Sequence, residues 1–185
     1  MCRIFRFAIF AFFSCLVSAS AQTSPSSDSR LKSIVANKAI RIAYRTDATP
    51  FSFKNQKGEP AGFSLDLCQL VTKSIAEQFG IPDIKIEWIP VTVQTRFSAI
   101  SSGQADLECG SSTITLGRSN DLSIEAYAIA LPRGDWALRL AVNKGLASVF
   151  RSGLIFAGFK TWFGHMGLQP GVLPRAAWAL GALSD

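Results

Sequence analysis

The apolar positions of the chain follow two spacings in turn, one typical of strands and one typical of helices. Ile40, Ile42 and Tyr44 recur at every second position, which predicts a strand, and the stretch 84–88 repeats this pattern. A helix signal lies between them, with Ser64 as a candidate cap and a stop at Gly80. Its apolar face carries Leu67, Cys68, Val71, Ile75 and Phe79.

The rest of the chain continues this alternation. We expect a short helix over 95–102, a strand over 106–109, a strand over 127–131, and a helix that Asp135 caps and that stops at Gly153. An aromatic helix with core residues ends at Gly164, and a small apolar helix covers 176–183. Strands that alternate with helices predict an α/β fold with a largely parallel sheet covered on both faces. The core residues of the aromatic helix are Phe156, Phe159, Trp162 and Phe163.

The first 21 residues have the three parts of a secretory signal peptide. Arg3 and Arg6 precede an uninterrupted apolar run over 7–17, and an Ala-x-Ala sequence ends at Ala21. The run is too short to span a bilayer, which takes about 20 apolar residues. We therefore expect cleavage after Ala21 and export, followed by a flexible polar leader over 22–31.

Cysteine placement fits export to a compartment that permits disulfides. A lipid-attachment role for Cys15 is disfavoured because Phe12 and Phe13 are bulky where such a site needs a small residue. Cleavage of the signal leaves Cys68 and Cys109. The two either form a disulfide or pack as small buried thiols, and the sequence leaves both alternatives open.

Length, composition and charge reduce the number of function classes that fit this chain. The 185 residues are 48% hydrophobic and 17% charged, which excludes a large multi-domain enzyme and a disordered chain. Of 19 Lys and Arg residues two lie in the signal segment, which leaves 17 against 13 Asp and Glu. This modest basicity favours anionic small molecules over nucleic acid. The only histidine, His165, has no acidic or cysteine partner nearby in sequence, so we expect no metal, no cofactor and no catalytic residue.

Polar residues follow three of the predicted strands at the point where each ends. Arg45 follows the first strand, 92–96 follows the second, and 110–118 follows the third. The carboxyl ends of parallel strands meet at one edge of the sheet, where ligands of open α/β sheets bind. The rigid fork of arginine suits carboxylates. The sequence therefore predicts a site for an anionic ligand at this edge.

Several motifs, in order along the chain, resemble those of family 3 extracellular solute-binding proteins, and most closely the glutamate/aspartate type. This resemblance runs from about residue 40 to the end and implies a periplasmic-binding-protein-like lobe. It also implies a periplasmic amino-acid receptor of an ABC importer, with a membrane permease as its partner. The motifs are GFSLDL at 62–67, IPVTVQTR at 89–96, ECGSSTITLGR at 108–118, YAIALPRGD at 127–135, LRLAVN at 138–143, RSG at 151–153 and WFG at 162–164.

The resemblance also implies that a lobe is missing. In the family a second lobe of roughly 100 residues separates the arginine at the position of Arg118 from the strand that begins at Tyr127. Only eight residues separate them here. We expect a single α/β lobe over 32–185, with its parts 32–118 and 127–185 joined by a shortened hinge at 119–126.

Six residues receive ligand-binding roles from the resemblance. Arg118 and Thr113 match positions that hold the α-carboxylate of the amino acid, and Ser111 matches a contact to its α-amino group. Arg45 and Arg96 match positions that receive the side-chain carboxylate in the glutamate/aspartate type. Three arginines at one edge favour a dicarboxylic ligand, because a neutral ligand would leave like charges poorly compensated.

The sixth residue, Phe63, matches an aromatic wall of the family's pocket. Val93 departs from the pattern, since the closest relatives have a hydroxyl residue there and one hydrogen bond is lost. With one lobe, the ligand would also lose one wall and the acidic partner of its amino group. We therefore expect millimolar or unmeasurable affinity in a monomer.

Two other functions stay open. One is a non-binding remnant that self-associates through the uncovered cleft edge, because loss of a lobe exposes strands and apolar surface. The other is a periplasmic dehydratase-like enzyme, which a few relatives of the fold are. A dehydratase needs a general acid, for which Glu108 and Asp47 are the candidates.

Overall fold

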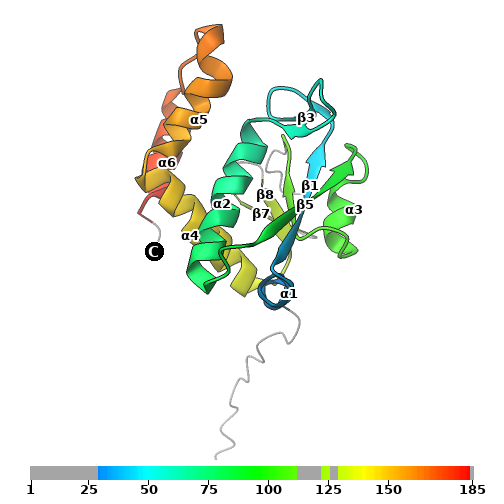
Figure 1. The fold of residues 1–185 in the computed structure, drawn as a ribbon. Helices are drawn as coiled ribbons and strands as arrows, with labels where there is room; N and C mark the ends of the chain where they lie inside the picture. The colour runs from blue at the N-terminus through cyan, green and yellow to red at the C-terminus, as the bar shows by residue number, and fades with distance from the viewer. Residues whose placement is uncertain (1–28, 112–121, 126–128, 184–185) are drawn as a thin grey trace, which may run out of the picture.

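The computed structural model describes residues 29–111, 122–125 and 129–183 (Figure 1). The predicted signal segment and most of the predicted leader lie outside these ranges. The end of the leader differs from the prediction, because α1 (Arg30–Asn37) begins there, Ser29 caps it and Leu31 is buried in the core. The folded part thus begins before the predicted boundary at residue 32.

A five-stranded sheet in the order β5-β1-β6-β8-β7 forms the centre of the fold. β1 (Ala39–Arg45) lies between β5 (Lys85–Val91) and β6 (Leu107–Cys109), and is parallel to both. β8 (Ile129–Pro132) runs antiparallel to β6 and to β7 (Leu122–Glu125), so four of the five strands point the same way. The predicted α/β fold with a mostly parallel sheet is confirmed.

Helices cover both faces of this sheet, as the alternation predicts. α2 (Phe63–Phe79) and α4 (Trp136–Arg151) pack together on one face, and α3 (Arg96–Ser101) covers the other (Figure 1). Side chains of β1 pack against the helices on both faces of the sheet, because successive side chains of a strand point to opposite faces. Ile40 and Ile42 belong to the large core cluster with α2 and α4, whereas Ala43 belongs to the smaller cluster with α3.

The predicted helix caps are right at Asp135 and wrong at Ser64. The Asp135 carboxylate accepts a hydrogen bond from the Leu138 N–H at 3.0 Å and so caps α4. Helix α2 starts one residue earlier than Ser64, with Gly62 as its N-cap, and Ser64 is buried in its first turn. The helix ends at Gly80 in the left-handed conformation, as predicted.

A small antiparallel sheet follows the carboxyl end of β1. It consists of β2 (Asp47–Ala48), β3 (Ser52–Lys54) and β4 (Pro60–Ala61). At the other end of the main sheet, the expected hinge contains β7, and the hinge residues 119–121 and 126 lie outside the described ranges.

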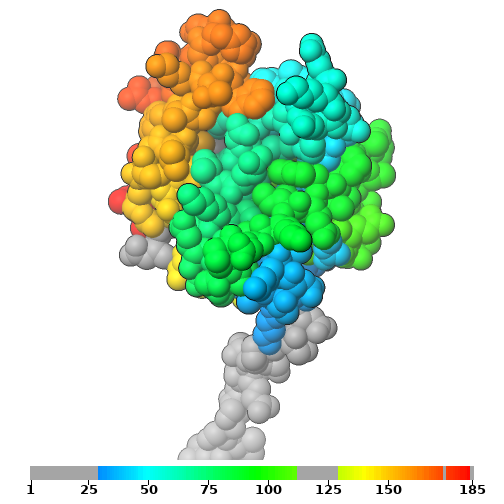
Figure 2. Space-filling view, in the orientation of Figure 1, coloured from blue at the N-terminus to red at the C-terminus, as the bar shows by residue number. Residues whose placement is uncertain are grey.

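The chain closes with α5 (Leu154–Phe163), a short 3-10 helix η2 (Gly164–Met166) and α6 (Val172–Gly181). Helix α6 begins four residues before the predicted start at 176. In Figure 2 the end of α5 projects from the body of the molecule. No helix among the described residues has both the length and the apolarity to cross a bilayer.

Only part of the aromatic helix α5 is core. Phe163 is buried, and the Trp162 indole N–H donates to Asp66 Oδ2 of α2 at 2.6 Å, which fixes α5 on α2. Phe156, which we expected in the core, is 46% exposed. Its ring packs against that of Trp178 of α6, with the ring centroids 5.0 Å apart, and is not itself buried in the main core.

Candidate functional site

The carboxyl edge of the sheet brings together two of the predicted binding residues. Arg45 ends β1, and Ser111 follows β6, the parallel neighbour of β1. The Arg45 Nη1 atom donates to Ser111 Oγ over 3.5 Å, and the arginine side chain is only 16% exposed. Two residues that lie far apart in sequence thus meet at the edge where a ligand was expected.

A buried serine fixes the backbone of Arg45. Ser52, at the start of β3, accepts a hydrogen bond from the Arg45 N–H at 2.9 Å and donates its own hydroxyl proton to the Arg45 carbonyl at 3.0 Å. Ser52 is fully buried, so water does not compete for these bonds. The small sheet therefore holds the end of β1 in place.

Asp47 is a site residue whose role sequence reasoning missed. Its Oδ1 atom accepts from Arg45 Nε at 3.0 Å and lies 2.9 Å from Arg45 Nη2. We expected Asp47 as a candidate general acid, whereas here it forms an ion pair. The carboxylate is 64% exposed, so it partly neutralises Arg45 at the surface. The two residues are separated by one position in the sequence, a spacing that does not by itself indicate an ion pair.

Arg96 occupies the matching place on the other side of β1. It is the first residue of α3, directly after the loop that follows β5, and it is buried. Its guanidinium lies over the ring of Phe97, 4.6 Å from the ring centroid, in cation–π geometry. The adjacent parallel strands β5, β1 and β6 end at Val91, Arg45 and Cys109, so Arg96 and Ser111 both lie in segments that follow a carboxyl end of the sheet.

Phe63 lies in an aromatic cluster. Its ring centroid is 5.4 Å from that of Phe163, 6.2 Å from that of Phe159 and 6.5 Å from that of Phe51. These contacts connect the start of α2 to α5. The predicted role of Phe63 as a ligand wall stays a prediction, and Thr113 and Arg118 lie outside the described residues.

Gly110 allows β6 to end close to its neighbours. A Cβ atom there would lie 2.2 Å from Glu108 Oε1 and 3.8 Å from Arg45 Cδ.

The two candidate general acids have different surroundings. Glu108 is fully buried, and Asp47 forms an ion pair with Arg45. Within the described ranges, no group of His, Cys, Asp and Glu side chains is placed to bind a metal ion.

A disulfide bond stabilises the carboxyl edge of the sheet by connecting β6 to α2. Cys68 of α2 and Cys109 of β6 are bonded, with their Cα atoms 6.5 Å apart, so the structure has the first of the two alternatives for these residues. Both are fully buried. Because Cys109 directly precedes Gly110 and Ser111, the covalent bond ties the end of β6 to α2.

A separate ion pair stabilises the opposite edge of the sheet. Buried Asp106 accepts from the Arg41 N–H at 2.9 Å and from Arg41 Nη2 at 2.6 Å. This hydrogen bonding raises the pKa of Arg41. Arg30 donates to the Ile100 carbonyl at 2.5 Å nearby, and burial lowers its pKa. These charges lie at the amino end of β1, away from Arg45, and serve the fold.

Comparison with known protein families identifies the family of this chain. Residues 40–165 match the model of the bacterial extracellular solute-binding proteins, family 3. The chain belongs to this family. Relatives include a glutamate/aspartate import solute-binding protein of Salmonella typhimurium, 30% identical over 51% of this chain and 32% of that protein. An L-glutamate/L-aspartate-binding protein of Pseudomonas aeruginosa is 34% identical over 45% of this chain and 28% of its own length. This family member thus spans about a third of these relatives.

Solved structures agree with the fold. A substrate-binding protein of an ABC uptake transporter from Streptococcus pneumoniae with bound histidine superimposes with a TM-score of 0.66 at 13% identity, over 75% of this chain and 98% of that one. The arginine-bound form of domain 1 from TmArgBP gives a TM-score of 0.54 at 18% identity, over 61% and 94%. At these identities the likeness concerns the fold alone.

Proposed function

We propose that this family 3 protein binds an acidic amino acid in the periplasm, after export through a cleaved signal peptide, and delivers it to an ABC permease. The observation that carries the proposal is the contact of Arg45 with Ser111 at the carboxyl ends of adjacent parallel strands. In this proposal Arg45 and Arg96 receive the side-chain carboxylate and Ser111 contacts the amino group. Thr113 and Arg118 hold the α-carboxylate. The names of the Salmonella and Pseudomonas relatives support an acidic ligand.

We further propose that this chain has a single lobe and binds its ligand without a second one. The direct pairing of β7 with β8 supports this, because Glu125 lies opposite Ile129 with only three residues between them. A ligand at the edge then has protein on one side and water on the other, so its ion pairs stay screened and contribute little each. The arginine-bound domain 1 of TmArgBP supports retention of some binding by a single lobe.

Loss of Arg45 should weaken glutamate binding. The monomer should bind L-glutamate with a dissociation constant in the millimolar range, near −4 kcal/mol, and Arg45→Gln should weaken this by about fivefold. NMR chemical-shift titration measures constants in this range. Arg133→Gln is the matched control, because Arg133 follows β8, which runs antiparallel and ends at the opposite edge. Equal weakening by both variants would contradict the site, and micromolar binding by the monomer would contradict the weakened single lobe.

Removal of the Asp47 charge should have the opposite effect. Asp47 competes with an acidic ligand for the Arg45 fork, so Asp47→Asn should tighten glutamate binding by about threefold. L-glutamine lacks the side-chain carboxylate, so its affinity should change less. The same titration with both ligands provides the comparison. Weaker glutamate binding in Asp47→Asn would show that Asp47 positions Arg45 more than it competes.

A further inference from the structure

The last quarter of the chain has a one-sided charge. Residues 136–184 contain no Asp or Glu, and all 13 acidic residues lie elsewhere, the last of them being the final residue, Asp185. Positive charge in this segment comes from five residues on α4, α5 and α6. They are Arg139, Lys144, Arg151, Lys160 and Arg175.

Large apolar side chains are exposed on α5 and the residues that follow it. Among the described residues, seven of the twelve exposed large hydrophobic side chains lie between Leu154 and Leu183, and Val172 and Leu180 are 83% and 68% exposed. In α6, a helix with Arg175 as its one charged residue, Trp178 is the only described side chain in the buried class. A soluble helix normally buries its apolar stripe, so this helix presents apolar surface that the fold does not use.

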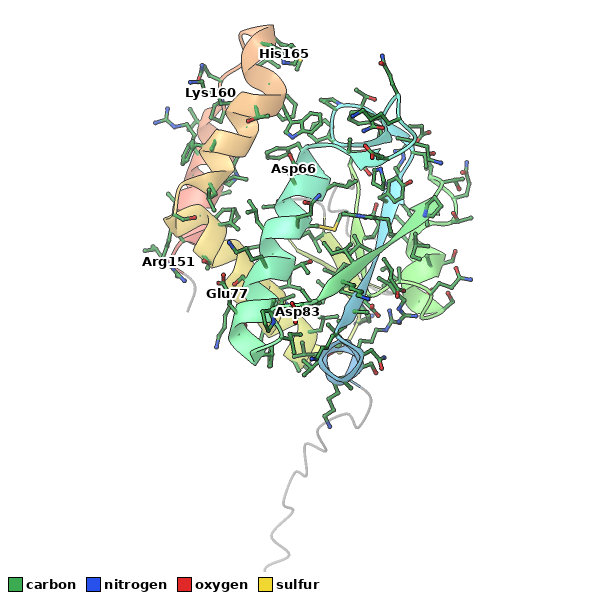
Figure 3. All side chains as sticks on the ribbon, in the orientation of Figure 1. Asp66, Glu77, Asp83, Arg151, Lys160 and His165 are labelled. Atoms are coloured by element: carbon green, nitrogen blue, oxygen red, sulfur yellow. A yellow bond between two sulfur atoms is a disulfide. The ribbon has the colours of Figure 1, made fainter. Side chains whose placement is uncertain are left out.

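A hollow joins the apolar and the positive groups. It lies between α5 and α6, has a volume of about 710 Å³, and is lined by Phe156, Phe159 and Leu168 together with Lys160 and Arg175. Figure 3 shows Lys160 on α5 and His165 on η2, in the projecting part of the molecule. The lining of the hollow therefore combines aromatic and cationic side chains.

We propose that the surface formed by α5, η2 and α6 binds to an anionic phospholipid bilayer. Helix α6 lies in the membrane interface with Val172 and Leu180 among the acyl chains, while Lys160 and Arg175 contact lipid phosphates. Apolar area together with cationic side chains is the combination by which interfacial helices bind anionic lipid. The hollow between α5 and α6 accepts a headgroup beside these two cations.

The positive charge of this surface favours an anionic membrane over a second copy of the chain as its binding partner. An isologous dimer through this surface would bring Lys160 and Arg175 of one copy close to the same cations of the other, with no acidic residue in 136–184 to compensate. An anionic lipid surface supplies the missing negative charge. The inference does not depend on glutamate binding, since the surface lies on helices outside the carboxyl edge of the sheet.

The test is flotation of the full mature protein with phospholipid vesicles. The protein should bind vesicles of equal phosphatidylglycerol and phosphatidylcholine, and 0.5 M salt or pure phosphatidylcholine should reduce the bound fraction, each by about tenfold. Lys160→Glu/Arg175→Glu should weaken binding to the anionic vesicles by a similar factor. The matched control is Lys32→Glu/Lys85→Glu, the same charge change at exposed positions outside this surface, which should stay within about twofold.

A second variant separates insertion from charge adsorption. Val172→Gln/Leu180→Gln keeps every charge and should still weaken binding by about fivefold, because the apolar contribution is lost. Unchanged binding by this variant, equal loss in the control pair, or no binding by the native protein would overturn the proposal. So would a native dimer in analytical ultracentrifugation that Val172→Gln/Leu180→Gln converts to monomer, since the surface would then be a contact between copies. Far-UV circular dichroism checks that each variant is folded.

Discussion

Replacing both Cys68 and Cys109 with alanine lowers the free energy of unfolding by about 4 kcal/mol. The disulfide closes a loop with a sequence separation of 41, and a crosslink of this length removes that much conformational entropy from the unfolded chain. Stabilities of natural domains are typically about 5–15 kcal/mol. The variant should therefore unfold at a far lower urea concentration than the native protein, or fail to fold at 37 °C.

Urea denaturation with and without dithiothreitol isolates the crosslink. Reduction of the native protein should reproduce most of the loss, whereas the double alanine variant should not respond to the reductant. Since Cys109 precedes Gly110 and Ser111, amide hydrogen exchange at the end of β6 should also rise on reduction. Equal stability of the oxidised and reduced native protein would show that burial of the two side chains, and not the covalent bond, supports this part of the core.

The sequence predicted the sheet and its edge because their signals are local and strong. Ile40, Ile42 and Tyr44 alternate in the strand that becomes the centre of the sheet, and a glycine ends the helix that follows. Parallel pairing then brings the ends of β5, β1 and β6 to one edge whatever the details of packing. That is why Arg45, Arg96 and Ser111 could be assigned to the same edge from the sequence.

The features that could not be predicted depend on contacts across the fold. The pairing of Asp47 with Arg45 depends on how the turn after β1 folds back, and the Arg41–Asp106 pair joins residues 65 positions apart. The exposure of Phe156 depends on how α5 packs against α6, where its ring lies against that of Trp178. Helical spacing alone identifies an apolar face but does not show whether another layer covers it.

The N-cap of α2 also depends on contacts across the fold. Serine is a favoured N-cap residue, but Gly62, and not Ser64, occupies the N-cap position. The Gly62 backbone has φ +138° and ψ 159°, a region open almost only to glycine. Two backbone hydrogen bonds hold the start of α2 against the preceding loop, from the Phe63 N–H to the Pro50 carbonyl and from the Ser64 N–H to the Phe51 carbonyl. The backbone of Phe51 and Ser52 lies too close to Gly62 for a side chain to fit at this position.

Gly62→Ala should therefore lower the free energy of unfolding by at least about 3 kcal/mol. An alanine Cβ would lie 2.2 Å from the Phe51 carbonyl oxygen and 2.8 Å from the Ser52 nitrogen, both of them backbone atoms. Relief of the overlap requires the loop before β3 to move, and Ser52, which directly follows this loop in β3, holds the backbone of Arg45. Urea denaturation measures the loss, and the affinity for glutamate should fall with it.

Gly58→Ala provides a reference for the cost of a positive backbone angle where an added Cβ atom overlaps with nothing. Gly58 has φ +83°, also unfavourable for alanine, but a Cβ atom there would meet no atom within 4 Å. This variant should lose only about 1 kcal/mol, the cost of a left-handed backbone angle in a non-glycine residue. If the two variants lost equal stability, the backbone angle alone would explain the glycine, and the close approach of the loop to α2 would have no energetic consequence. A larger loss in Gly62→Ala assigns the difference to the close approach of the loop together with the backbone angles of Gly62, which lie in a region open almost only to glycine.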